Sequence, residues 1–145
     1  MFFFNVHQNR EDLNELNDKI NQFNHYNAQV IVCSRDSVYS FRNKTKTPVH
    51  YGGMGPLEIL FLSDIMGEIH EMFKCSIDSG PDKGEVLRCT CIINASGIVK
   101  YHSVSDTMVS TSFDDILNII EKMQVSDIKP ISNFVNKALF SLSAL

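Results

Sequence analysis

Arg88 and four cysteines are the residues of this chain that could carry out chemistry. Arg88 lies within a run of apolar and small residues, and its guanidinium cannot lose its proton, so a buried Arg88 needs an anionic or strongly polar partner. A cysteine reacts as a thiolate, which forms when a helix N-terminus or a nearby cation lowers the pKa of the thiol. The first question is therefore whether any thiol can stand beside Arg88 at the start of a helix.

The positions of the cysteines argue against a reactive thiol. Cys33 ends an apolar run, and Cys89 and Cys91 share one strand face because they are two residues apart. Free buried cysteines behave mostly as small apolar residues, so we expect these three to be packing residues. Cys75 lies near the end of a predicted helix, where the helix dipole disfavours a thiolate. No Cys-x-x-Cys pair is present, and we expect reduced thiols with no disulfide framework.

The five histidines do not show a metal-ligand spacing. His25 and His70 fall within predicted helices, where we expect both side chains to be solvated. The sequence therefore predicts no metal site and no cofactor.

Length and charge exclude several classes of function. A chain of 145 residues is long enough for one domain with a real core, and its net charge of −4 without a basic run argues against nucleic acid binding. No apolar run approaches the roughly 20 residues that cross a bilayer, and Met-Phe-Phe-Phe at the start is too short for a signal peptide. We expect no membrane association and a cytoplasmic protein, with an organelle as the alternative.

The hydrophobic pattern predicts alternating strands and helices that end in a hairpin. A tight turn at residues 94–97, with Gly97 at positive φ, joins a buried strand over 85–93 to an edge strand over 98–105. The other predicted elements are strands at 2–6, 28–34 and 59–63 and helices that start near Asn9, Asp36, Asp64, Phe113 and Pro130. This order predicts an α/β fold of the thioredoxin-like class, in which helices cover both faces of a central mixed sheet of about five strands.

Several short motifs resemble those of the peroxiredoxin family, in the same order and at the same spacing. The motifs are Val30–Ser37, Thr47-Pro48, Gly52-Gly-Met-Gly-Pro-Leu57, Leu62-Ser-Asp64, Leu87–Gly97 and Val104-Ser-Asp106. Ile128-Lys-Pro130 and the helix behind it resemble the C-terminal arm of the typical two-cysteine branch. The resemblance implies a thioredoxin-like fold, and it identifies Arg88 with the active-site arginine of the family.

The residues that carry the chemistry of that family have no counterparts here. The resemblance places Asn9 at the position of the peroxidatic cysteine, and an amide nitrogen has no free lone pair with which to attack a peroxide. The resolving cysteine falls in a segment that is deleted between Gln124 and Ile128, and Ser110-Thr-Ser112 replaces a second arginine. We also expect the N-terminal hairpin of the family to be missing, because the chain starts at what resembles the third strand.

We therefore interpret the chain as a peroxiredoxin-like pseudoenzyme with a thioredoxin-like domain over 1–124 and a C-terminal arm with a helix over 125–145. We expect a structural or protein-binding subunit that forms a homodimer or a heteromer with a peroxiredoxin or a larger assembly. The predicted interface residues are Ile98, Lys100, His102 and Val104 on the edge strand and Phe134, Leu139 and Leu142 on the C-terminal helix. The alternative is a thiol-dependent peroxidase that uses one of Cys33, Cys75, Cys89 and Cys91 as a displaced nucleophile.

Overall fold

The computed structural model describes residues 2–5 and 10–125. The chain divides into two compact units, Met1–Thr111 and Ser112–Leu145. In the second unit, residues 113–125 form a helix. Its buried side chains, at the spacing that the sequence predicts, are Phe113, Ile116, Leu117 and Ile120. The proposed C-terminal arm, residues 125–145, falls almost entirely outside the described residues.

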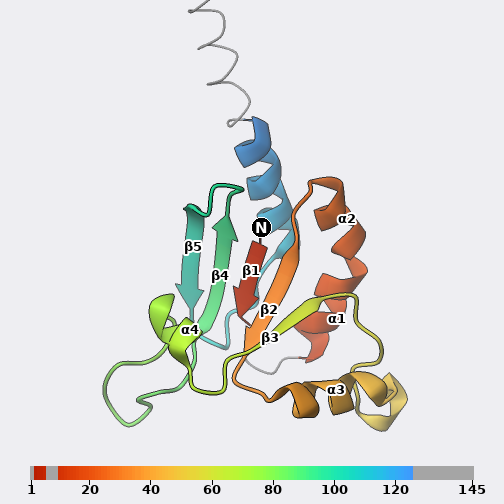
Figure 1. Ribbon diagram of the computed structural model, residues 1–145, viewed down its shortest axis with the longest axis vertical. Coiled ribbons are helices and arrows are strands. Elements are labelled where there is room, and N and C mark those ends of the chain that lie inside the picture. The colour runs from red at the N-terminus through yellow and green to blue at the C-terminus, as the bar shows by residue number, and fades with distance from the viewer. Residues whose placement is uncertain (1, 6–9, 126–145) are drawn as a thin grey trace, which may run out of the picture. The chain divides into compact units, whose positions relative to one another are not determined.

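The first unit is built on a mixed five-stranded sheet with the strand order β3-β2-β1-β4-β5 (Figure 1). The strands are β1 (Phe2–Asn5), β2 (Val30–Ser34), β3 (Leu60–Ser63), β4 (Arg88–Ile93) and β5 (Val99–Ser105). β2 is parallel to both β1 and β3, whereas β4 is antiparallel to β1 and β5. The predicted mixed sheet is confirmed, and β5 lies at one edge of it, as its alternating sequence predicts.

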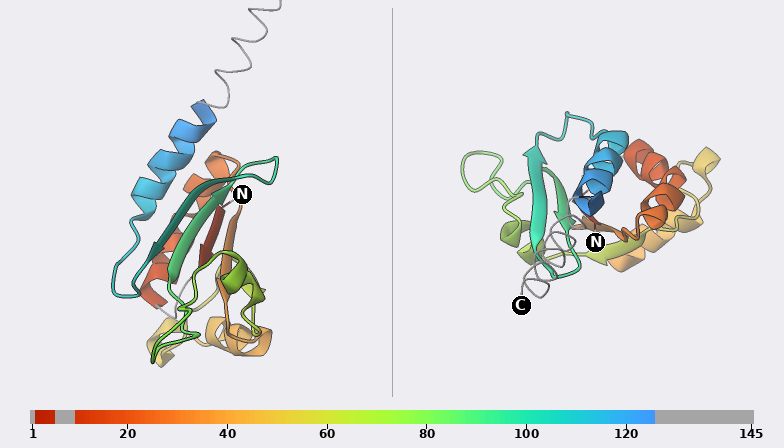
Figure 2. Two further views of the ribbon diagram at one scale, coloured as in Figure 1. Left: turned by 90° about the vertical axis from the view of Figure 1, so that its left-hand side faces the viewer. Right: turned by 90° about the horizontal axis from the view of Figure 1, so that it is seen from above.

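Helices lie on both faces of this sheet, as the sequence predicts (Figure 2). The helices of the first unit are α1 (Arg10–Asp18), α2 (Ile20–His25), α3 (Val38–Lys46), the 3-10 turn η1 (Val49–Tyr51) and α4 (Glu68–Met72). α1 and α2 cover one face, and they bury the apolar positions Leu13, Leu16, Ile20 and Phe23. α4 lies on the opposite face. Within residues 2–5 and 10–125, no helix combines the length and the apolar character that a membrane crossing requires.

The hairpin turn between β4 and β5 forms as the sequence predicts. Gly97 has a φ of 78°, which a residue with a side chain rarely adopts. The Asn94 side-chain oxygen accepts hydrogen bonds from the backbone N–H groups of Ser96 at 3.0 Å and Ile98 at 2.9 Å. This local closure fixes the register of β5 against β4 and therefore which side chains of the two strands share a face.

Two helices begin later than the sequence predicts. α3 begins at Val38 rather than Asp36, because the Ser37 hydroxyl accepts a hydrogen bond from the Ser40 N–H at 3.1 Å and caps the helix. α4 begins only at Glu68, since a turn at Asp64–Gly67 comes first, closed by the Gly67 N–H on the Asp64 carbonyl at 3.0 Å. The extra turn changes which side chains of this region face the core.

In the glycine-rich loop after η1, Gly53 is required for steric reasons. A Cβ atom on Gly53 would lie 1.9 Å from the carbonyl oxygen of Thr47, far inside van der Waals contact. The same carbonyl accepts a hydrogen bond from the Gly55 N–H at 3.1 Å. The Thr-Pro and glycine motifs of the sequence are therefore parts of one folded loop.

Candidate functional sites on the two faces of the sheet

Arg88, the first residue of β4, is only 4% exposed. Its Nη1 donates to the carboxylate of Asp12, and its Nη2 donates to the carbonyl oxygen of Thr107 at 3.2 Å. Asp12 is buried in the first turn of α1, where the positive end of the helix favours a carboxylate. The sequence predicted an anionic partner for Arg88 but did not identify Asp12 as that partner.

Within the described residues, the hydrogen-bond partners of the Arg88 guanidinium are oxygen atoms and include no sulfur atom. The Nε of Arg88 is buried and has no hydrogen-bond partner within residues 2–5 and 10–125. Asn9, the predicted position of the lost cysteine, lies outside the described residues. The described part of this site therefore consists of Arg88, Asp12 and the Thr107 carbonyl.

The four thiols are buried, and the alternation of β4 turns two of them away from Arg88. Neighbouring residues of a strand point to opposite faces, and Arg88 faces α1, so Cys89 and Cys91 face the side of α4. Cys33 and Cys91 pack together on that side with Ile69 and Phe73 from α4 and its C-terminal end. The prediction that these thiols are packing residues is consistent with this burial.

The surroundings of the thiols favour the protonated form. Burial, with the charge of Asp64 and the neighbouring Cys75, raises the pKa of Cys33 to about 12. A hydrogen bond with Cys75, together with burial, raises the pKa of Cys89, and burial raises that of Cys91. These environments oppose a thiolate at neutral pH.

His70 was predicted to be solvated, and this prediction is wrong. The side chain is 1% exposed, because the turn before α4 directs it inward. Its Nδ1 lies 2.5 Å from Asp64 Oδ2, which also accepts the backbone N–H of His70 at 2.9 Å. Burial alone would raise the pKa of Asp64, but the hydrogen bonds from His70 and from the Ile69 backbone outweigh burial and lower it.

Cys33 lies beside this buried pair. One donor atom from each of Cys33, Asp64 and His70 lies within 4.8 Å of the other two. A thiolate, a carboxylate and an imidazole are common ligands of divalent transition metals. Sequence reasoning missed this group, since its members come from three elements and have no ligand spacing along the chain.

The predicted interface residues of the edge strand lie on β5 or directly before it. Ile98 is 57% exposed, Lys100 and His102 are exposed, and Val104 is half-buried. The Nε2 of His102 lies 2.8 Å from the Phe73 carbonyl oxygen, which ties this side chain to the end of α4. The other predicted interface residues lie outside the described residues and are Phe134, Leu139 and Leu142.

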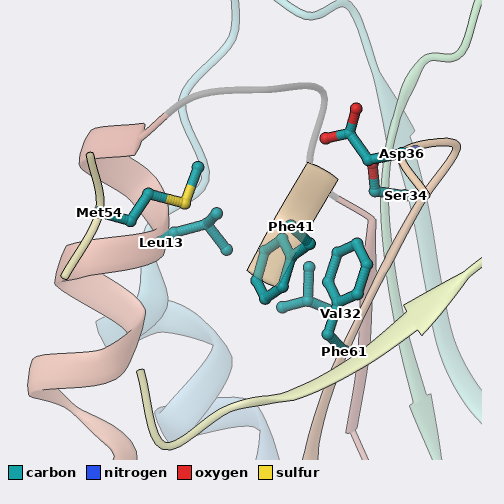
Figure 3. A pocket seen from close by; sticks show the side chains of 7 residues that line it. All are labelled: Leu13, Val32, Ser34, Asp36, Phe41, Met54 and Phe61. Atoms are coloured by element: carbon teal, nitrogen blue, oxygen red, sulfur yellow. The ribbon is translucent and has the colours of Figure 1, made fainter. Parts of the chain in front are cut away.

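A small cavity lies between α1, α3 and the parallel strands (Figure 3), and Arg88 is not among the residues that line it. Its volume is about 10 Å³, which is room for a single water molecule. Stacking of Phe41 on Phe61, with ring centroids 3.5 Å apart, fills much of this region. Its lining residues are Leu13, Val32, Ser34, Asp36, Phe41, Met54 and Phe61.

The mixed sheet with helices on both faces defines a thioredoxin-like domain, and comparison with known proteins narrows this class. The model of the AhpC/TSA family matches residues 3–102. The chain is 31% identical over 110 residues to human peroxiredoxin-4, and this match covers 76% of the chain and 40% of human peroxiredoxin-4. It is 35% identical over 107 residues to the mouse mitochondrial thioredoxin-dependent peroxide reductase, and this match covers 74% of the chain and 40% of the mouse protein. The chain belongs to the AhpC/TSA family, that is, to the peroxiredoxins.

Solved structures support the same assignment. The reduced 2-Cys peroxiredoxin of Plasmodium vivax superposes with a TM-score of 0.78 at 26% identity, over 87% of this chain and 66% of that one. The mitochondrial 2-Cys peroxiredoxin of Plasmodium falciparum gives a TM-score of 0.78 at 25% identity, over 88% and 76%. The family resemblance and the fold that it implied are therefore confirmed. The matched region spans about two fifths of the length of the curated relatives.

Proposed function

We propose that this chain is a peroxiredoxin-family domain that does not itself reduce peroxide and that acts as a structural or protein-binding subunit. The observation that carries this proposal is the position of its sulfur atoms. All four cysteines of the sequence are buried, and Cys89 and Cys91 are turned away from Arg88 by strand alternation. A peroxide-reducing thiolate needs access to its substrate and a cation or helix N-terminus beside it.

The electrostatics of the thiols support the same proposal. With a pKa of about 12, Cys33 would be a thiolate in on the order of one molecule in 10⁵ at pH 7. The positive charge that lowers a thiol pKa in this family resides on Arg88, which hydrogen-bonds to Asp12. Activation of a displaced cysteine would therefore require both exposure and a new cation.

Peroxide turnover tests the loss of catalysis. Stopped-flow mixing of the full chain with hydrogen peroxide and a thiol reductant is expected to give no consumption above the reductant alone. Intact-mass analysis after peroxide treatment is expected to give the unmodified mass. Catalytic consumption that disappears in a single Cys→Ser variant would overturn this half of the proposal in favour of a thiol-dependent peroxidase with a displaced nucleophile.

The binding role rests on the edge strand β5. An edge strand presents backbone N–H and C=O groups that can pair with another chain. Val99, the first residue of β5, and Ile98 directly before it are apolar and are 47% and 57% exposed. The partner in this proposal is a second copy of the chain or another peroxiredoxin, with Phe134, Leu139 and Leu142 of the C-terminal arm adding apolar contacts.

Light scattering during gel filtration tests the binding role. The wild-type chain, alone or with a peroxiredoxin, is expected to elute as a complex, and Ile98→Glu with Val99→Glu is expected to dissociate it through charge at the edge. The matched control is Leu60→Glu on β3, the opposite edge, where Leu60 is 51% exposed. A monomer at all concentrations that binds no peroxiredoxin would overturn the binding role, and so would dissociation by the control alone.

A further inference from the structure

Cys33, Asp64 and His70 come from three separate segments of the chain that meet on the α4 side of the sheet. Cys33 lies in β2, Asp64 directly follows β3, and His70 lies in α4. Parallel pairing sets Ser34 opposite Ser63, and the Asp64 N–H donates to the Ser34 carbonyl at 2.8 Å. The His70 N–H donates to the Asp64 carboxylate at 2.9 Å. Backbone contacts thus fix the relative positions of all three residues.

The donor atoms of these residues are already gathered and shielded from water. They lie within 4.8 Å of one another, and Cys33, Asp64 and His70 are 0%, 6% and 1% exposed. Tetrahedral zinc, with ligand bonds of about 2.0–2.3 Å, would hold such atoms roughly 3.3–3.8 Å apart. A bound ion therefore requires side-chain shifts of about one ångström rather than a new fold of the chain.

We propose that Cys33, Asp64 and His70 bind a divalent transition-metal ion of the zinc class. The thiolate and the carboxylate carry two negative charges and the neutral imidazole carries none, so a divalent cation makes the buried group neutral. Calcium and magnesium prefer sets of oxygen ligands, whereas a thiolate with an imidazole suits zinc. This site is independent of whether the chain reduces peroxide.

The metal replaces the thiol proton that Cys33 holds in the metal-free site. Without a cation nearby, burial beside Asp64 and Cys75 keeps Cys33 protonated. On binding, the thiol proton of Cys33 is released to solvent and its sulfur lone pair forms the bond to the metal. The short contact between His70 Nδ1 and Asp64 Oδ2, 2.5 Å, lengthens as both groups turn toward the ion.

Three protein ligands leave one position of a tetrahedral ion open, as in zinc sites that hold a water molecule there. Cys75, whose sulfur donates to the His70 carbonyl oxygen at 3.3 Å, is not among the residues whose donor atoms all lie within 4.8 Å of one another.

Metal titration of the full, reduced chain tests the proposal. After treatment with a chelator, Co²⁺ is expected to bind at one equivalent with the visible bands of tetrahedral cobalt and a near-ultraviolet thiolate-to-metal band, and Zn²⁺ is expected to displace it. Cys33→Ser and His70→Gln should each weaken binding at least about tenfold. The matched controls are Cys91→Ser, a buried thiol outside the group, and His25→Gln, an exposed histidine, and both should bind as the wild type does.

Circular dichroism of each variant identifies any that fails to fold, and X-ray absorption of the zinc-loaded wild type decides the ligands without a variant. One sulfur ligand, with nitrogen and oxygen in the other positions, is expected. Binding below half an equivalent, a shell of nitrogen and oxygen alone, or unchanged affinity in a folded Cys33→Ser would overturn the site.

Discussion

Strand β4 carries two kinds of chemistry on neighbouring residues. Arg88 faces α1 and is paired with Asp12, whereas Cys89 and Cys91 face the side of α4 and lie among other buried thiols. An arginine cannot give up its charge, so its burial requires a partner of opposite charge. A thiol can remain neutral, so its burial requires only that it keep its proton. The two faces therefore bury polar side chains differently: Arg88 keeps its charge and is paired, whereas the thiols remain neutral.

The comparison shows why the fold itself requires Arg88. The pair of Arg88 and Asp12 joins β4 to α1 and is almost inaccessible to solvent. Loss of either partner leaves an unpaired buried charge, which costs far more than the net stabilisation that the pair provides. The presence of Arg88 is thus explained by the fold, whether or not a thiolate stands beside it.

Removal of Asp12 is expected to give the largest effect on stability. Asp12→Ala leaves the buried guanidinium of Arg88 without its carboxylate and should lower the free energy of unfolding by about 3–5 kcal/mol. Urea denaturation followed by circular dichroism measures the loss. Asp18→Ala, on the exposed side of the same helix, should change it by less than about 0.5 kcal/mol.

The double variant Asp12→Leu with Arg88→Met sharpens this result. It removes both charges and is expected to be more stable than Asp12→Ala, since no orphaned charge remains. If the double variant is the less stable of the two, the pair stabilises the fold through its hydrogen bonds rather than by mutual compensation of charge.

Removal of His70 is expected to have the next largest effect and probes the opposite face. His70→Ala removes a hydrogen bond to the Asp64 carboxylate and leaves a void, which together should cost about 2–4 kcal/mol. The measurement is again denaturant unfolding, with His25→Ala as the control on an exposed position. A cost no greater than that of the control would show that the Asp64 and His70 side chains do not stabilise this face.

Much of the framework could be predicted from the sequence because its signals are local. Apolar β-branched runs predicted the strands, the Asn94–Gly97 segment predicted the hairpin, and the charge of Arg88 inside an apolar run predicted an anionic partner. The burial of Cys33, Cys89 and Cys91 also follows from their place in strands, whereas the buried Cys75 lies outside the strands. The resemblance to peroxiredoxins then ordered these elements into one sheet.

The composition of the sites could be predicted only in part, because it depends on contacts between distant segments. Asp12 and Arg88 are 76 positions apart, and no pattern in either segment points to the other. His70 was wrongly predicted to be solvated, because its burial accompanies a contact with Asp64 across the turn closed at Gly67, which the hydrophobic pattern does not reveal. Cys33 joins Asp64 and His70 only through the pairing of β2 with β3.

Alkaline pH should lower the free energy of unfolding through the face that carries Cys33. The pKa of Cys33 is raised from 9.0 to about 12, so its contribution to stability is present below pH 9 and is lost as the pH rises toward 12. At pH 10.5 the loss should be about 2 kcal/mol relative to Cys33→Ala, whose remaining decline comes from other groups. Unfolding curves at pH 8 and pH 10.5 measure this difference. Equal declines in both proteins would mean that Cys33 titrates normally and that its face is open to water.

Acid pH should have the smallest effect on the free energy of unfolding. It acts on the α4 side of the sheet through the carboxylate of Asp64. The pKa of Asp64 is lowered in the folded state, so its contribution to stability is present above its ordinary value of 3.8 and is lost as the pH falls below it. Asp64→Asn exchanges a charged acceptor for a neutral one, which should cost about 1 kcal/mol at pH 6 and less at pH 3. Denaturant unfolding at the two pH values tests this, with Asp18→Asn as an exposed control. A cost that grows on acidification would mean that Asp64 is stabilised in its protonated form, and the α4 face would then bury its carboxylate, like its thiols, by retaining a proton.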